Sequence, residues 1–111
     1  MTWTVEQLEQ ISEVYRDFLT VLKPVLDSKA PGTILRITGI PFGMIYNVLS
    51  NKYGYDVERV RQLAHNIRAQ GLIEEDSLGF FTPTAKGEDL IRALSGMGDA
   101  IEKRVPPLPS I

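Results

Sequence analysis

Several side chains between residues 59 and 68 can form paired hydrogen bonds with flat polar edges. Arg59 and Arg61 carry guanidinium groups, which can donate two parallel hydrogen bonds to a guanine. Gln62 and Asn66 carry amides, which can pair with an adenine in the same way. We therefore expect a base-reading helix face, and its candidate DNA contacts are Arg59, Arg61, Gln62, His65, Asn66 and Arg68.

The helix that would position these side chains is predicted over residues 57–70. Asp56 is suited to be its N-cap, because a carboxylate accepts hydrogen bonds from the backbone amides of the first turn. Apolar residues recur at intervals of three and four and define the face directed to the core: Val60, Leu63, Ala64 and Ile67. Gly71 suits the left-handed position that ends a helix, and Leu72 then folds back on Ile67 in a Schellman motif.

A two-stranded hairpin is predicted to follow this helix. Residues 72–75 and 80–83 have the length and composition of strands. Residues 76–79 separate them and supply turn chemistry, with Gly79 able to adopt a positive φ. Because successive strand residues point to opposite faces, either Phe80 or Phe81 must be directed to the core.

A final helix is predicted over residues 84–104, with Thr84 as its N-cap. Its apolar face comprises Leu90, Ile91, Leu94, Met97 and Ile101. Gly96 and Gly98 each lower helix propensity by about 1 kcal/mol. We therefore expect a bend or a break after Ser95.

A long first helix is predicted within residues 1–29. Thr4 and Gln7 have the spacing of a capping box at its start. The apolar residues follow a spacing of three and four along it: Leu8, Ile11, Tyr15, Phe18 and Leu22. Pro24 cannot donate its backbone amide, so we expect a kink or a break near Val21.

A strand and another helix are predicted between the first helix and the base-reading helix. Residues 33–37 are β-branched and apolar, which favours a short strand that pairs with the hairpin. Pro41 suits the first turn of a helix, whose inward residues would be Ile45, Val48 and Leu49. Residues 53–55 would form the turn between the two helices.

The expected fold class is α+β and mostly helical, in a single domain over residues 1–104. Within it, residues 1–29 form an N-terminal helix, residues 33–83 the helix-turn-helix and hairpin, and residues 84–104 the C-terminal helix. Residues 105–111 contain three prolines and are expected to form an extended tail.

The order of elements and three short motifs resemble the winged helix-turn-helix superfamily. Gly71-Leu72-Ile73, Gly79-Phe80-Phe81-Thr82 and Thr84-Ala85-Lys86-Gly87 are similar in particular to MarR-type and PadR-type transcription regulators. The resemblance covers roughly residues 33–95. It implies double-stranded DNA as a partner, with residues 57–70 as the recognition helix in the major groove.

The same resemblance implies a homodimer joined through the first and last helices. The apolar faces of both helices are also wide for a domain of this size, which favours a second copy as their cover. The expected interface residues are Leu8, Ile11, Tyr15, Phe18, Leu22, Leu94, Met97 and Ile101. Many MarR-type regulators take small phenolic effectors, but no residue of this chain identifies such a site or its ligand.

Charge is distributed unevenly along the chain. The formal net charge is −2, which is not the basic balance of a strong DNA-binding protein. Residues 29–71, however, carry six basic residues against two acidic ones. The expected contacts to the DNA backbone, apart from the recognition helix, are Arg36, Lys52, Tyr53 and Tyr55.

The hairpin carries an acidic run that phosphate would repel, namely Glu74, Glu75 and Asp76. The negative charge of this run and the negative net charge of the chain favour an alternative function. In this alternative, the protein is a winged-helix module that binds a protein partner and has lost DNA binding.

Other functional classes find no support in the residues. The chain has no cysteine, a single histidine and no glycine-rich phosphate loop, so we expect no enzyme, metal site or cofactor. No apolar run approaches the roughly 18 residues that a membrane span requires. The expected location is the cytoplasm.

Overall fold

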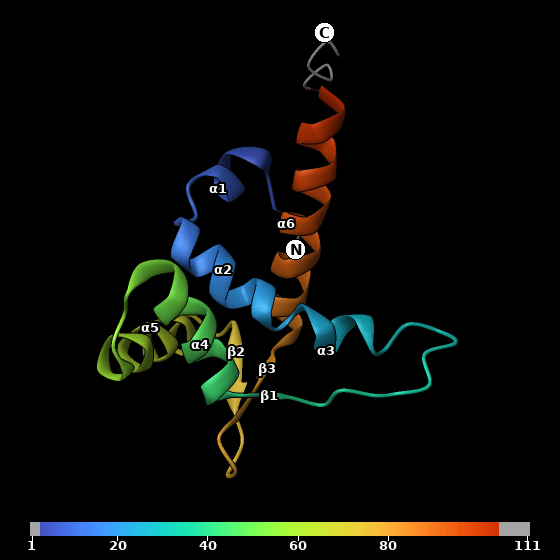
Figure 1. The fold of residues 1–111 in the computed structure, drawn as a ribbon. Coiled ribbons are helices and arrows are strands. Elements are labelled where there is room, and N and C mark those ends of the chain that lie inside the picture. Colours follow the sequence, from blue (N-terminus) through green and yellow to red (C-terminus); the bar gives the residue numbers. More distant parts are fainter. Residues whose placement is uncertain (1–2, 105–111) are drawn as a thin grey trace, which may run out of the picture.

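The computed structural model describes residues 3–104 of the chain, with side chains described for residues 3–96. The fold is α+β and mostly helical, as predicted, with a three-stranded antiparallel sheet in the order β1-β3-β2 (Figure 1). In chain order the elements are α1 (Val5–Glu9), α2 (Glu13–Val21), α3 (Lys23–Asp27), β1 (Ile40–Pro41), α4 (Phe42–Tyr53), α5 (Val57–Ala69), β2 (Ile73–Glu75), β3 (Phe80–Pro83) and α6 (Ala85–Arg104).

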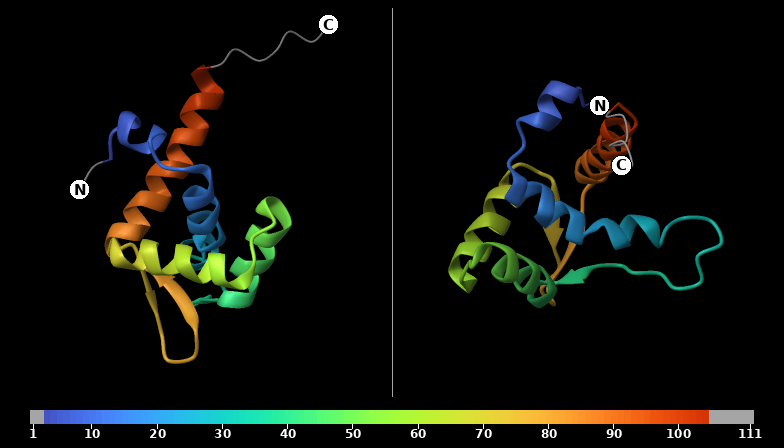
Figure 2. Two further views of the ribbon diagram at one scale, coloured as in Figure 1. Left: turned by 90° about the vertical axis from the view of Figure 1, so that its left-hand side faces the viewer. Right: turned by 45° about the horizontal axis from the view of Figure 1, so that its top comes forward.

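The hairpin of β2 and β3 and the helix α6 extend from opposite ends of the molecule. Figure 1 and the left view of Figure 2 show the hairpin below the helices and α6 rising above them. The loop between α3 and β1 projects to one side, and α5 lies on the other side (Figure 1). The α3–β1 loop and α5 are therefore separated by the body of the domain.

Phe18 of α2 is a central residue of the core, with no exposed surface. Its ring meets that of Phe81 from β3 edge to face, with 6.3 Å between centroids. Leu8 and Leu22 are also buried in this core, at 3% and 0% exposure. The expectation that Leu8, Phe18 and Leu22 form a dimer interface is therefore wrong, because the protomer's own helices and sheet cover these side chains.

The first predicted helix is divided into three helices. The capping box is confirmed, since Thr4 Oγ1 accepts from the Gln7 amide at 3.2 Å and Gln7 Oε1 accepts from the Thr4 amide at 2.9 Å. One continuous helix is wrong, because Ser12 caps a new helix, α2, and the Arg16 guanidinium donates to the Leu8 carbonyl at 2.9 Å. The expected break near Val21 is confirmed, since α2 ends at that residue.

The predicted strand over residues 33–37 is wrong, and the sheet is instead joined by Ile40 and Pro41. Ile40 lies opposite Phe81, so an extension of this pairing toward residue 38 would reach Pro83 of β3. Proline has no amide hydrogen to donate, and α6 begins directly afterwards. The β-branched residues 33–37 therefore have no strand to pair with and remain in the projecting loop.

α4 and α5 meet at a tight turn, as predicted. Gly54 ends α4 with a φ of 71°, and Asp56 caps α5 by accepting from the Arg59 amide at 2.8 Å. Ile45 and Leu49 of α4 are fully buried, as predicted. Val48 is 42% exposed, so its predicted inward position is wrong.

The hairpin turn is stabilised by Asp76. Its Oδ1 accepts hydrogen bonds from the backbone amides of Leu78 and Phe80, each at 2.9 Å. Gly79 adopts a φ of 83°, as the predicted turn requires. Of the two aromatic residues, Phe81 is directed to the core and Phe80 remains 38% exposed.

The end of α5 is connected directly to the start of α6. The predicted Schellman motif is confirmed, since the Gly71 amide donates to the Arg68 carbonyl at 2.9 Å and the Leu72 amide donates to the Ile67 carbonyl at 3.4 Å. The Leu72 carbonyl then accepts from the amide of Thr84 at 3.0 Å. We call this contact the α5–α6 joint.

α6 continues through residue 104, so the predicted bend or break after Ser95 is wrong. A glycine lowers helix propensity without removing a backbone hydrogen bond, and the Ser95 hydroxyl donates to the Ile91 carbonyl at 3.0 Å. The side chains of Met97 and Ile101 and the predicted tail of residues 105–111 lie outside the described residues. Within residues 3–104, no helix is both long enough and apolar enough to span a membrane.

Candidate nucleic-acid interface

One face of α5 is buried and the opposite face is free. The four apolar residues predicted to face the core are all buried, namely Val60, Leu63, Ala64 and Ile67. Because successive helix residues are about 100° apart, Gln62 and His65 lie nearly opposite this face. The six predicted base-reading side chains are all exposed, and they lie on α5 as a group.

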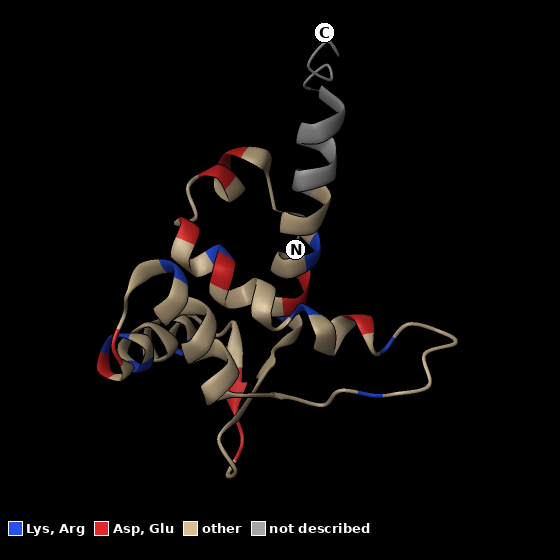
Figure 3. Cartoon of the chain, viewed as in Figure 1, with Lys and Arg blue, Asp and Glu red and all other residues tan. Residues whose placement is uncertain are grey.

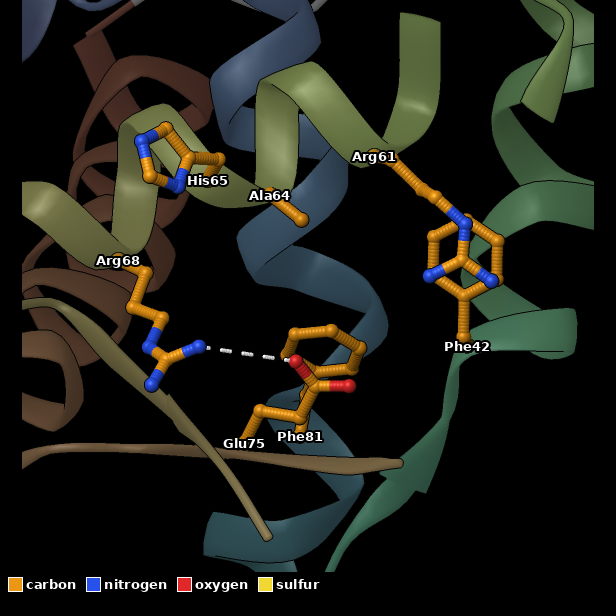
Figure 4. Close-up of a pocket in the computed structure, with 7 residues that line it drawn as sticks. All are labelled: Phe42, Arg61, Ala64, His65, Arg68, Glu75 and Phe81. Carbon is orange, nitrogen blue, oxygen red and sulfur yellow. Dashed lines mark ion pairs between the residues drawn. The ribbon is translucent and has the colours of Figure 1, made fainter. Parts of the chain in front are cut away.

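On the side of α5 that faces the hairpin, two arginines border a small hollow of about 100 Å³. The Arg61 guanidinium lies over the ring of Phe42, 4.4 Å from its centroid. Arg68 Nη1 lies 3.7 Å from Glu75 Oε1 of β2. Figure 4 shows these two arginines at opposite sides of the hollow, with His65 also lining it.

On the other side of α5, the polar side chains are ordered by their neighbours. The Arg59 guanidinium lies over the Tyr55 ring, 4.4 Å from its centroid. The Gln62 amide donates to Asn66 Oδ1 at 3.1 Å, one helical turn away. The hydrogen bond between Gln62 and Asn66 must therefore break before either amide can make a bidentate contact with adenine.

A cluster of charged and polar groups holds α4 against α2. Lys52 Nζ lies 2.8 Å from Asp17 Oδ2 and 3.0 Å from Glu13 Oε1. The Tyr53 hydroxyl donates to the same Asp17 oxygen. Lys52 and Tyr53, which we expected to contact the DNA backbone, thus face the carboxylates of α2.

These contacts change the pKa of each member of the cluster. Burial alone would raise the pKa of Asp17, but hydrogen bonds from Lys52 and Tyr53 outweigh it and lower this pKa below its usual value. Hydrogen bonds to Asp17 and Glu13 raise the pKa of Lys52. Partial burial and the hydrogen bond to Asp17 raise the pKa of Tyr53 to about 12. At neutral pH, Asp17 is therefore ionised, and Lys52 and Tyr53 both carry the protons that they donate.

Arg36 is not brought together with the other predicted DNA-binding residues. It is exposed on the loop between α3 and β1, which projects away from the side that carries α5 (Figure 3). Tyr55, by contrast, lies beside α5, and its ring centroid is 5.4 Å from that of Tyr53.

Two of the three acidic residues of the hairpin make contacts within the protein. Asp76 is occupied by the turn amides of Leu78 and Phe80, and Glu75 faces Arg68. Glu74 makes no ion pair within the part of the chain whose side chains are described. Figure 3 shows this acidic hairpin below the basic residues of α5.

Three contacts within the site were not predicted from the sequence. Phe42 supports Arg61, Glu75 faces Arg68, and Asp17 binds Lys52 and Tyr53. Phe42 follows Pro41 at a helix start, which is a local signal for its position. The Glu75 and Asp17 contacts join residues from different elements, so no local pattern predicts them.

Comparisons with models of protein families, with curated proteins and with solved structures found no match for this chain. The geometry of the site therefore carries the functional argument.

Proposed function

We propose that this protein is a winged-helix DNA-binding regulator of transcription that acts as a homodimer in the cytoplasm. The order of elements supports the winged-helix assignment, because α2, β1, α4 and α5 precede a hairpin and a further helix, and β3 lies between β1 and β2. In this assignment α5 is the recognition helix and the β2–β3 hairpin is the wing.

The observation that carries the proposal is the exposed face of α5. It presents three arginines, two amides and a histidine from a helix whose other face is fully packed in the core. A helix of this kind fits the major groove, where guanidinium and amide groups can distinguish base pairs. Gln62 and His65 project farthest from the core and would be nearest the bases, and the arginines on both sides would meet bases or phosphates.

Binding to mixed-sequence duplex DNA at low and moderate salt tests this proposal. The parent protein is expected to bind at low salt, with an affinity that falls steeply as salt rises, because bound phosphates release counterions. Arg59→Ala and Arg61→Ala are each expected to weaken binding by about 10-fold or more. Fluorescence anisotropy of a labelled duplex measures both effects.

Arg36→Ala is the matched control, since it removes the same charge from the loop on the other side of the domain. This substitution is expected to change the affinity for duplex DNA by less than about twofold. The absence of salt-dependent binding by the parent at low ionic strength would overturn the proposed DNA-binding function.

A homodimer is the second part of the proposal. Ile11, Tyr15 and Leu94 are only partly buried within the protomer, so they remain available to a partner. Met97 and Ile101, the other expected contacts on α6, stay predictions, because their side chains lie outside the described residues. A two-fold axis at these helices would present two recognition helices about 34 Å apart, the length of one DNA turn.

Light scattering at micromolar concentration measures the molar mass in solution and so distinguishes a dimer from a monomer. We expect twice the mass of the 12.4 kDa chain. A monomer mass over the whole concentration range contradicts the homodimer.

The alternative function is a winged-helix module that binds a protein. Two observations favour it: the net charge is −2, and Ile34 and Leu35 are 101% and 75% exposed on the projecting loop. Exposed apolar residues on a protruding loop are a common feature of protein contacts. The DNA-binding assay distinguishes the two functions, because this module would leave the Arg59 and Arg61 variants indistinguishable from the parent.

A further inference from the structure

The hollow beside α5 brings two arginines, a histidine and one carboxylate together. Arg61, His65 and Arg68 recur at intervals of four and three, so they follow one side of the helix. Their side chains line the hollow together with Phe42 and Phe81, which form part of its apolar wall. Glu75 enters from β2, so the only acidic group lining this hollow comes from the hairpin (Figure 4).

The contact between Arg68 and Glu75 is loose. Its shortest N–O distance is 3.7 Å, longer than a hydrogen bond, and the two side chains are 57% and 32% exposed. An exposed ion pair with this geometry contributes little to stability. Glu75 can therefore leave Arg68 without disturbing the fold.

A carboxylate and a phosphate present similar oxygens to a guanidinium group. Glu75 thus occupies a position at which Arg68 could bind a phosphate oxygen instead. Arg61 and His65 lie along the same side of α5 and would add positive charge or a donor to that phosphate. Asp76 does not compete for the position, because its carboxylate accepts from the turn amides.

We propose that this hollow is a phosphate-binding site whose occupant in the free protein is the Glu75 carboxylate. In the DNA complex, which rests on the function proposed above, a backbone phosphate takes the place of Glu75 beside Arg68. The acidic hairpin then reduces affinity for any duplex by competing for Arg68, in addition to its general repulsion of phosphate. Because this competition adds the same cost to every duplex, Glu75 lowers affinity without changing the ratio of affinities between sequences.

Glu75→Gln and Glu74→Gln test the proposal as a matched pair. Each variant removes one negative charge from β2, but the two side chains point to opposite faces of the strand. Glu75→Gln is expected to raise the affinity for mixed-sequence duplex DNA by about fivefold, which corresponds to the release of one exposed ion pair. Glu74→Gln is expected to change it by less than about twofold.

A double-mutant cycle with Arg68→Ala completes the test. In the Arg68→Ala background, Glu75→Gln is expected to give no gain in affinity, because the group for which Glu75 competes is absent. Equal gains from Glu75→Gln and Glu74→Gln, or a gain that persists without Arg68, would overturn the proposal. Thermal unfolding of each variant verifies that the fold is retained.

A titration with inorganic phosphate separates this proposal from the DNA-binding function. In the Glu75→Gln protein, the backbone amide resonances of residues 61–68 are expected to shift at millimolar phosphate, and Arg68→Ala is expected to abolish the shift. If the parent fails to bind DNA but these shifts occur, the phosphate site holds and the proposed function is wrong. If no shift occurs and the affinity for DNA is unchanged in Glu75→Gln, the site itself is wrong.

Discussion

Gly87→Ala is expected to lower the free energy of unfolding by about 3 kcal/mol or more. A Cβ atom at residue 87 would lie 1.9 Å from the carbonyl oxygen of Leu72 and 2.9 Å from its carbonyl carbon. Both are backbone atoms, and the oxygen already accepts a hydrogen bond from the Thr84 amide. Neither can move aside without separating α6 from the end of α5.

Gly96→Ala is the matched control for this substitution. It changes the same residue type in the same helix, but among the described residues no atom outside the adjoining stretch of α6 lies within 4 Å of the added Cβ. Alanine has the higher helix propensity, so this variant is expected to gain about 1 kcal/mol. Urea unfolding followed by circular dichroism measures both changes, and a Gly87→Ala protein within 1 kcal/mol of the parent would contradict the close approach at Leu72.

Phe18→Ala is expected to lower the free energy of unfolding by about 3–5 kcal/mol. The ring has no exposed surface and is in edge-to-face contact with Phe81, so its removal leaves a cavity between α2 and the sheet. Because a domain of this size is stable by only about 5–15 kcal/mol, a measurable fraction of the variant is expected to be unfolded on mild heating.

The dependence of this loss on protein concentration distinguishes the core from a dimer interface. A side chain buried within one protomer gives the same loss of unfolding free energy at a micromolar protein concentration and at one about 100 times lower, whereas an interface residue gives a loss that follows mass action. Ile34→Ala, at a position that is 101% exposed, is expected to stay within about 0.5 kcal/mol of the parent.

Local signals in the sequence predicted the α5 region well. The cap at Asp56, the buried face of α5 and the Schellman end at Gly71 each depend on residues within one or two turns of one another. The exposed group of base-reading candidates follows from the same periodicity. Each of these features is specified by residues that are close together in the sequence.

The predictions that were wrong required knowledge of a competing partner. Residues 33–37 have strand composition, but Pro83 ends the strand that they would have joined. The apolar residues of the first predicted helix have continuous helical spacing. Ser12, however, offers a second N-cap, and Arg16 donates to the Leu8 carbonyl in the last turn of α1. The intrinsic propensity of a segment indicates which secondary structures it can form. Its contacts with the rest of the fold decide which of them it adopts.

The candidate site was predicted in its residue types but not in their pairing. Arg61, Arg68 and Lys52 were identified as basic groups, yet the neighbours that hold them come from other elements: Phe42, Glu75 and Asp17. Asp17 and Lys52 are separated by 35 positions in the sequence. A contact between such distant residues depends on how α2 and α4 cross, which no local pattern encodes.

The α5–α6 joint makes a single residue, Leu72, the link between two helices. The amide of Leu72 closes the last turn of α5, and its carbonyl receives the Thr84 amide at the start of α6. Gly87 lets α6 approach this carbonyl closely, and Lys86 Nζ donates to the Gln70 carbonyl at 3.2 Å. If α6 joins two protomers and α5 reads DNA, as proposed, the contact at Leu72 sets the distance between the two α5 helices. A shift of α6 at the dimer axis would then change the spacing of the DNA sites that the pair can span.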